Sequence, residues 1–139
     1  MNKTDRTEFE IHKEYLIDAD LAVVWDCLAD SEISGFWQSE DCVIGDKAGD
    51  KIDLFGGWVT GNIISRKEKQ EISYTWKVIE WDKQTPPSIV QYQLREGKEN
   101  QTIVTLSHTH LPTLEEQNSH DTGWDDQFFN PIRSYLEKA

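Results

Sequence analysis

His108 and His110 are the residues whose spacing most directly suggests chemistry. They lie two positions apart in a segment that alternates apolar and polar residues, so a β-strand would place both side chains on one face, about 7 Å apart. A His-x-His pair binds zinc when a third ligand converges on it. Because no third ligand lies nearby in sequence, His12, His120 or an acidic side chain would have to supply it in space.

The alternation along this segment also gives His108 a second interpretation. Its side chain shares a face with Val104 and Leu106, which predicts an inward orientation, whereas His110 lies nearer the strand end and is expected to be solvated. An inward histidine is either a polar group in a cavity or an ordinary hydrogen-bonded core residue. We assign no metal ligands and no cofactor from this pattern.

The aromatic residues give a stronger signal than the histidines. The sequence holds 6 tryptophans, and each indole combines a large apolar area with a single hydrogen-bond donor. This number indicates either an aromatic core or an aromatic-lined pocket. Trp25 shares a helical face with Leu21 and Leu28, so it is predicted to be a core residue. Trp58 and Trp81 follow no clear period, and their orientation stays open.

Signatures of catalysis are missing from the sequence. It contains no Gly-rich phosphate loop, no Gly-x-Ser-x-Gly elbow and no His-Glu-x-x-His motif. Cys27 has no adjacent base, and Cys42 lies among Glu40, Asp41 and Asp46, whose negative charge is expected to raise the pKa of its thiol. We therefore assign no catalytic residue and take both cysteines as structural or incidental.

Composition bounds the remaining functions. A length of 139 residues fits one domain, 1–139, and a formal net charge of −12 argues against binding to nucleic acid or to an anionic membrane. Acidic residues without any Lys or Arg occupy two segments, 14–46 and 99–132. They are typical of solvated helical faces or of a docking surface for a basic partner. With two cysteines and no apolar leader, a cytoplasmic location is expected.

Periodicity predicts the elements that must position these side chains. A half-buried strand over 9–18 is followed by a helix over 20–29, which Asp20 can cap, and by a short helix over 31–37. The later strands are expected over 50–55, 58–65, 71–81, 88–95 and 102–110. Because short turns join them, the sheet should be antiparallel.

A long helix over about 120–138 closes the chain. Its apolar residues Trp124, Phe128 and Ile132 recur at intervals of four, which is typical of one helical face. Pro131 lies inside this helix and predicts a kink or a local break. An antiparallel sheet that curls around the helix would bury its apolar face, so the predicted fold class is α+β.

Six segments, in this order along the chain, resemble a known family. They are ADLAVVWDCLAD (19–30), FWQ (36–38), EISYTWKV (71–78), IVTLSHTHLP (103–112), HDTGW (120–124) and SYLEK (134–138). From about Tyr15 to Lys138 the chain is similar to the bacterial single-domain relatives of the heat-shock-protein-90 ATPase activator. That family lies within the START-like, birch-pollen-allergen-like helix-grip superfamily.

The resemblance implies a helix-grip fold, in which a curved antiparallel sheet of about six to seven strands wraps around the long C-terminal helix. One or two short helices are expected after the first strand. A hydrophobic cavity between sheet and helix is also implied, with ordinary core packing as the alternative for its tryptophans. The residues expected to line the cavity are Trp37, Trp76, Tyr92, His108, Trp124 and Phe128.

Three functions fit this interpretation, because one fold hosts many activities. The one we favour is binding of a small apolar or aromatic ligand, anchored by a polar group such as His108 or Tyr92. The second is docking of a monomer or homodimer on a chaperone, with the acidic segments meeting a basic surface. The third is an enzyme of the cyclase or hydratase type, with His108 as general base.

Overall fold

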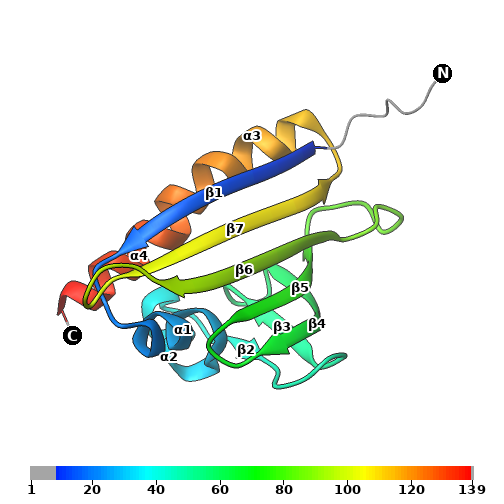
Figure 1. The fold of residues 1–139 in the computed structure, drawn as a ribbon. Helices are drawn as coiled ribbons and strands as arrows, with labels where there is room; N and C mark the ends of the chain where they lie inside the picture. Colours follow the sequence, from blue (N-terminus) through cyan, green and yellow to red (C-terminus); the bar gives the residue numbers. More distant parts are fainter. Residues whose placement is uncertain (1–8, 139) are drawn as a thin grey trace.

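Seven antiparallel strands form one sheet in the computed structural model, which describes residues 9–138 (Figure 1). The strands are β1 (Phe9–Ile17), β2 (Val43–Ile44), β3 (Lys51–Leu54), β4 (Val59–Lys67), β5 (Glu71–Val78), β6 (Ser88–Glu96) and β7 (Thr102–Leu111). Their order across the sheet is β1-β7-β6-β5-β4-β3-β2. The predicted antiparallel sheet is confirmed, and the two-residue strand β2 is an addition that no sequence pattern indicated.

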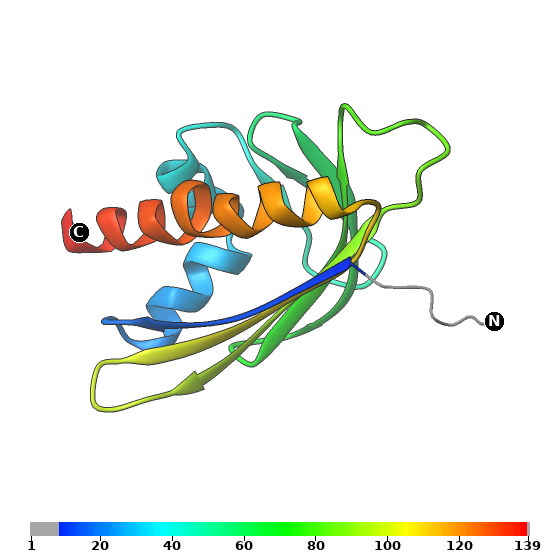
Figure 2. The same cartoon turned by 90° about the horizontal axis from the view of Figure 1, so that it is seen from above.

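Two short helices and one long helix complete the fold. α1 (Leu21–Ala29) and α2 (Ser31–Gln38) lie between β1 and β2, and the C-terminal helix consists of α3 (Leu114–Gly123), the π-helical segment η2 (Trp124–Phe129) and α4 (Asn130–Lys138). Figure 2 shows this helix lying along the hollow side of the curved sheet. The architecture is the α+β helix-grip fold that the resemblance implied. Within residues 9–138, no helix has the length and apolar character that crossing a membrane requires.

The long helix begins six residues earlier than the predicted start, at Leu114. Thr113 precedes it, and the Thr113 side chain accepts a hydrogen bond from the backbone N–H of Glu116 (3.1 Å). The Thr-x-x-Glu spacing is that of a capping box. Because residues 115–119 are all polar, no apolar period marks this first part of the helix.

The two short helices begin at aspartates that behave differently. Asp20 occupies the N-cap position of α1 but makes no side-chain cap hydrogen bond, so the predicted capping contact is absent there. Asp30 at the start of α2 does cap, because its Oδ1 accepts from the backbone N–H of Ile33 (3.0 Å). The corner between α1 and α2 therefore depends on the second aspartate.

Pro131 does not break the long helix. The six residues of η2, shortly before it, adopt π-helical register, and the backbone N–H of Asn130 donates to the carbonyl of Asp125, five residues back. A proline within a regular α-helix clashes with the carbonyl four residues earlier, and a π turn changes that register. The wide turn also buries two consecutive aromatic residues, since Phe128 packs on β6 and Phe129 on β1.

The inner face of the sheet carries the core. The alternate residues of β5, β6 and β7 that the sequence assigned to one face are all buried, and the parity rule is confirmed for each strand. They are Ile72, Tyr74, Trp76, Val78, Val90, Tyr92, Leu94, Val104, Leu106 and His108. The C-terminal helix covers these residues, so the sheet and the helix share one core.

Contacts from β1 fix the position of the long helix. Tyr15 stacks on Phe129 with ring centroids 3.9 Å apart, and its hydroxyl donates to Asp125 Oδ1 (2.6 Å). Lys13 Nζ donates to the same carboxylate (3.1 Å) and to the backbone carbonyl of Asp121 (2.7 Å). The Tyr15 hydrogen bond, followed by the Lys13 contacts, lowers the pKa of Asp125. The helix is thereby held in register where η2 begins.

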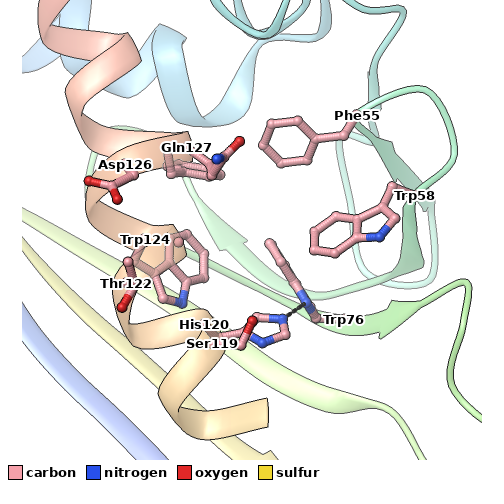
Figure 3. Close-up of a pocket in the computed structure, with 11 residues that line it drawn as sticks. Phe55, Trp58, Trp76, Ser119, His120, Thr122, Trp124, Asp126 and Gln127 are labelled. Carbon is pink, nitrogen blue, oxygen red and sulfur yellow. Dashed lines mark hydrogen bonds between the residues drawn. The ribbon is translucent and has the colours of Figure 1, made fainter. Parts of the chain in front are cut away.

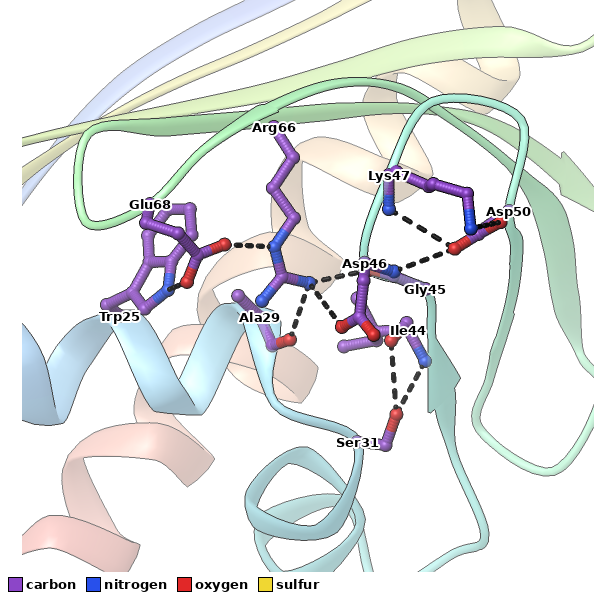
Figure 4. A network of polar contacts seen from close by, with 10 residues as sticks. All are labelled: Trp25, Ala29, Ser31, Ile44, Gly45, Asp46, Lys47, Asp50, Arg66 and Glu68. Carbon is purple, nitrogen blue, oxygen red and sulfur yellow. Dashed lines mark hydrogen bonds and ion pairs between the residues drawn. The ribbon is translucent and has the colours of Figure 1, made fainter.

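A second polar cluster joins α1 to the far part of the sheet (Figure 4). Arg66 Nη1 of β4 donates to the carbonyls of Ala29 (3.1 Å) and Gly45 (2.6 Å), while Nε donates to Glu68 (2.6 Å). The guanidinium also lies 5.6 Å from the ring centroid of Trp25, which is buried as predicted for a core residue. A planar fork with several donors satisfies these acceptors together, which a lysine could not do.

Candidate functional site

A pocket of about 500 Å³ opens between the C-terminal helix, β5 and the turn that joins β3 to β4. Figure 3 shows Trp58 and Phe55 on one side of it, Trp124 and Gln127 on the other, and Trp76 with His120 between them. The residues that line it are Phe55, Trp58, Trp76, Ser119, His120, Thr122, Gly123, Trp124, Asp126, Gln127 and Phe128. The walls are therefore aromatic on the sheet side and partly polar on the helix side.

The turn between β3 and β4 supplies two of the aromatic walls. Phe55, Gly56 and Gly57 have φ values of 54°, 64° and 93°, so three consecutive residues adopt left-handed backbone conformations. Glycine tolerates this region, but a bulky residue such as Phe55 does so at a cost. Gln38 Oε1 accepts from the Phe55 backbone N–H (2.9 Å) and holds the turn. Such strained positions cluster at binding sites, where placement of a side chain outweighs the cost.

The aromatic walls meet at steep angles. The rings of Phe55 and Trp58 lie 6.2 Å apart at 78°, and those of Trp58 and Trp76 lie 6.5 Å apart at 86°. Trp124, from the helix, lies 5.0 Å from Trp76 with an interplanar angle of 41°. Edge-to-face arrangements of this kind are favourable pairings of aromatic rings. Together the four rings form an open box.

Behind the box, His108 links the helix to the sheet. Trp124 Nε1–H donates to His108 Nδ1 (3.1 Å), so Nδ1 is the unprotonated nitrogen of that ring. His108 Nε2–H then donates to Ser88 Oγ (2.8 Å), and the Ser88 hydroxyl donates to the Trp76 carbonyl (2.8 Å). This assignment of donors and acceptors follows from the geometry of the network. Both ring nitrogens of His108 are therefore engaged.

His120 completes the same network on the pocket side. Its Nε2 accepts from Trp76 Nε1–H (3.2 Å), and its Nδ1–H donates to the Glu116 carbonyl (2.9 Å). The rings of His120 and His108 have centroids 5.2 Å apart. Each histidine thus receives an indole N–H, and protonation of either acceptor nitrogen would place two N–H groups against each other.

Burial keeps both histidines neutral. Desolvation lowers the pKa of His108 well below its ordinary value, and the neighbouring His120 lowers it further. Desolvation also lowers the pKa of His120, although its hydrogen bond to the Glu116 backbone opposes the shift. His108 has an exposed fraction of 0%, so its buried, doubly bonded ring has no nitrogen open to a substrate in the pocket.

The structure separates the six residues expected at the cavity into two groups. Trp76, Trp124 and Phe128 line the pocket. His108 lies behind its wall, as described above. Tyr92 and Trp37 are buried deeper in the core, where Tyr92 Oη pairs with Tyr74 Oη (2.7 Å) and Trp37 Nε1–H donates to the Cys27 carbonyl (2.8 Å). Aromatic side chains thus fill much of the space between helix and sheet, and the pocket lies at one end of it.

Several lining residues escaped the sequence interpretation. Trp58, with 39% of its surface exposed, stacks on His120 at 6.2 Å and donates from Nε1 to Glu80 Oε1 (3.0 Å). Its only signal was the preceding Gly-Gly turn, which brings Phe55 to the pocket as well. The sequence indicated His120 only as a possible third zinc ligand, because its polar neighbours in the helix give no sign of a buried position.

The metal and thiol chemistry considered from the sequence has no geometric basis in residues 9–138. No group of three or more His, Cys, Asp or Glu side chains in this range is arranged to hold a metal ion. His108 is buried, as parity predicted, but His110 does not share its face: the left-handed φ of 63° at His110 breaks the alternation and leaves its side chain exposed, as its place near the strand end suggested. Burial raises the pKa of both Cys27 and Cys42 to about 12, with Asp26 and Asp53 as the respective charged neighbours. Neither thiol is therefore activated as a nucleophile.

Solved structures of this fold superpose over nearly the whole chain. An HSP90 activator from Plasmodium falciparum gives a TM-score of 0.79 at 23% identity, covering 94% of this chain and 96% of that chain. CalU16 from Micromonospora echinospora gives 0.77 at 18% identity, with 91% and 73% covered. The Aha1 dimer from Colwellia psychrerythraea gives 0.75 at 18% identity, with 92% and 96% covered. At these identities the likeness shows the fold.

Sequence comparison identifies the family. No curated protein matches the chain significantly. The family described as Activator of Hsp90 ATPase homolog 1-like protein, in contrast, matches residues 18–137. Because this match spans most of the sequence and agrees with the helix-grip fold, the chain belongs to the Activator of Hsp90 ATPase homolog 1-like protein family.

Proposed function

We propose that the protein binds a small, largely apolar or aromatic molecule in the pocket between the β3–β4 turn and the C-terminal helix. The observation that carries this proposal is a pocket of about 500 Å³ with aromatic walls, at one end of the interface between the helix and the sheet. Its volume lies within the range of about 300–1,000 Å³ that is typical of ligand sites. A flat molecule would contact Trp58, Trp76 and Trp124 together.

The aromatic walls of the pocket are preorganised for ligand binding. The indole N–H groups of Trp58, Trp76 and Trp124 donate to Glu80, His120 and His108, so each ring has a fixed orientation. Rings that are already ordered lose little entropy on binding, which favours affinity. This supports a site that holds its shape when empty.

The helix side of the pocket offers polar partners. Within the described residues, the side chains of Ser119, Thr122 and Gln127 make no hydrogen bond to another protein group. Their hydroxyl and amide groups remain free to bond a polar substituent on the ligand. The proposed ligand is therefore an aromatic or apolar body with a polar edge.

Gly123 provides a direct test, because it lines the pocket and belongs to the helix. A Cβ added at this position meets no atom within 4 Å, and its φ of −63° suits any residue. In Gly123→Leu the side chain should fill the pocket and weaken binding of 2-naphthol, a flat neutral probe, at least about tenfold. Replacing a helical glycine should also stabilise the fold by about 0.5–1 kcal/mol. Isothermal titration calorimetry and urea denaturation measure the two effects.

Gly123→Ala is the matched control for this substitution. It should give the same gain in stability and leave 2-naphthol binding nearly intact, since a methyl group occupies little of the pocket. Equal affinities in the wild type and Gly123→Leu would contradict the proposed site. Absence of 2-naphthol binding to the wild type would contradict the proposed function itself.

Docking on a chaperone is the second candidate, favoured by the family match and by the likeness to an HSP90 activator. An acidic hollow on α2 supports it: Glu32, Glu40 and Asp41 line the hollow, together with Phe36, which is 57% exposed. Affinity for a purified Hsp90-type chaperone should fall at least about tenfold between about 0.05 and 0.5 M salt. Asp41→Lys should weaken it further, whereas Glu99→Lys, in the β6–β7 turn, should not. Affinity that is independent of salt and of Asp41 would exclude this surface.

A further inference from the structure

The aromatic box carries ionised groups of one sign only. Asp126 is the one Asp or Glu that lines it, with its carboxylate turned away from the rings (Figure 3), and no Lys or Arg among residues 9–138 lines it. Glu80 and Glu116 stand directly behind the walls, in contact with Trp58 and His120. The remaining titratable group is His120, and it is neutral because both nitrogens are engaged and its ring is buried. The carboxylates behind the walls therefore have no positively charged side chain opposite them in the lining of the box.

The orientation of the indoles adds to this potential. An aromatic ring is negative over its face and positive at its edge, and the N–H is the most positive part of an indole edge. All three indole N–H groups of the box already donate to protein acceptors: a carboxylate for Trp58 and imidazole nitrogens for Trp76 and Trp124. A ligand in the pocket therefore contacts the faces of these rings and finds no free indole N–H group.

Rings that meet at nearly right angles surround a guest from several sides. Phe55, Trp58 and Trp76 make successive angles of 78° and 86°, and Trp124 stands across from Trp58 (Figure 3). Aromatic cages of this kind hold quaternary ammonium groups by cation–π attraction, for which tryptophan is the best partner. A neutral apolar guest gains contact area from such walls but no cation–π attraction to the negative faces of the rings.

Building on the proposed function, we infer that the ligand of this pocket is an organic cation, an alkylated ammonium group attached to an apolar or aromatic body. The ammonium group sits among Trp58, Trp76 and Trp124, with the Glu80 carboxylate, which accepts from the Trp58 indole (3.0 Å), behind the wall as its counter-charge. An anionic ligand is disfavoured by the same groups. This assigns the charge of the ligand, which the volume and the apolar walls alone leave open.

The test compares two molecules of one shape. Phenyltrimethylammonium, as its chloride salt, and tert-butylbenzene differ only in the charged nitrogen, and benzenesulfonate supplies the opposite charge. Calorimetric titration of the full chain should show the cation binding at least about tenfold more tightly than the neutral isostere, with the anion weaker than either. 2-Naphthol serves as the reference ligand for the pocket.

Two variants and one control show where the charge preference arises. Glu80→Gln keeps an acceptor for the Trp58 indole and should weaken binding of the cation about two- to fivefold while leaving tert-butylbenzene unchanged, because an exposed carboxylate contributes modestly. Glu115→Gln, an exposed position of α3 outside the pocket, removes the same charge and should change neither. Trp58→Leu keeps an apolar wall but removes the ring, so the cation should lose about tenfold and the neutral isostere much less.

The outcomes separate this inference from the function on which it rests. Tighter binding of the cation, sensitive to Glu80 and Trp58, establishes the charge preference. If tert-butylbenzene binds as tightly as phenyltrimethylammonium, the pocket binds ligands but the inference about charge is wrong. If neither molecule binds, and 2-naphthol does not bind either, the proposed function fails as well.

Discussion

His108→Ala is expected to lower the free energy of unfolding by about 3–5 kcal/mol. The substitution empties a fully buried site and leaves two polar groups without partners, the Trp124 Nε1–H and the Ser88 hydroxyl oxygen. A buried donor without an acceptor costs about 1–3 kcal/mol by itself, and the cavity adds to this. Urea denaturation monitored by tryptophan fluorescence measures the loss.

The neighbouring histidine on the same strand provides the control. His110 is exposed and has a φ of 63°, so His110→Asn keeps a residue that tolerates left-handed backbone and should change stability by less than about 0.5 kcal/mol. A loss below about 1 kcal/mol for His108→Ala would show that the network between Trp124, His108 and Ser88 does not contribute as described.

Acidification is expected to destabilise the fold between neutral pH and about pH 5. In the unfolded chain His108 and His120 titrate near the ordinary pKa of 6.5, whereas burial lowers both pKa values in the folded chain. The folded state therefore binds fewer protons in this range. The stabilisation that depends on the neutral rings is complete above pH 6.5 and is lost as the pH falls through the lowered pKa values. The loss is about 1.4 kcal/mol per pH unit for each histidine that resists protonation.

His120→Gln isolates the contribution of one ring. Glutamine does not titrate and can still accept from the Trp76 indole, so the variant should show a shallower decline of stability with acidification. The carboxyl groups with lowered pKa, Glu68 and Asp125, have ordinary values of 4.5 and 3.8 and act at lower pH. Urea midpoints measured along the pH series test this, and an equal decline in both proteins would contradict the role of His120.

The strand pattern was the part of the structure most fully contained in the sequence. Alternation along β5, β6 and β7 placed Tyr74, Tyr92 and His108 on the inner face because one side of each strand is buried, and burial imposes a period of two. The resemblance supplied the helix-grip arrangement, which periodicity alone leaves undetermined.

The candidate site was only half visible for physical reasons. Phe55 and Trp58 reach it from a turn, where left-handed backbone conformations replace any period. His120 reaches it from a polar stretch of helix whose cap at Thr113 is the first sign that a helix exists there. The π turn before Pro131 shifts the helix face, so spacing by four could not assign Phe129. Residues on regular strands were predictable, whereas those placed by the β3–β4 turn and by the polar start of the long helix were not.

The cavity that the resemblance implied between sheet and helix is replaced in the structure by a pocket at one end of that interface. Tyr92 and Trp37 are buried in the packed core behind the pocket, with their polar atoms paired inside the protein. A ligand at that position would have to displace packed rings and leave those atoms unsatisfied, which is costly. The end of the interface, where the β3–β4 turn stands away from the helix, needs no such displacement.

The indole Nε1–H resonances of the 6 tryptophans provide the most direct measurement of where a ligand binds. In a ¹H–¹⁵N titration with 2-naphthol, the resonances of Trp58, Trp76 and Trp124 should shift together and saturate at one affinity, because these rings line the pocket. That of Trp25, which is buried and donates to Glu68 away from the pocket lining, should stay in place. Shifts at Trp37 without shifts at Trp58, or no shifts at all, would contradict a ligand site at this end of the fold.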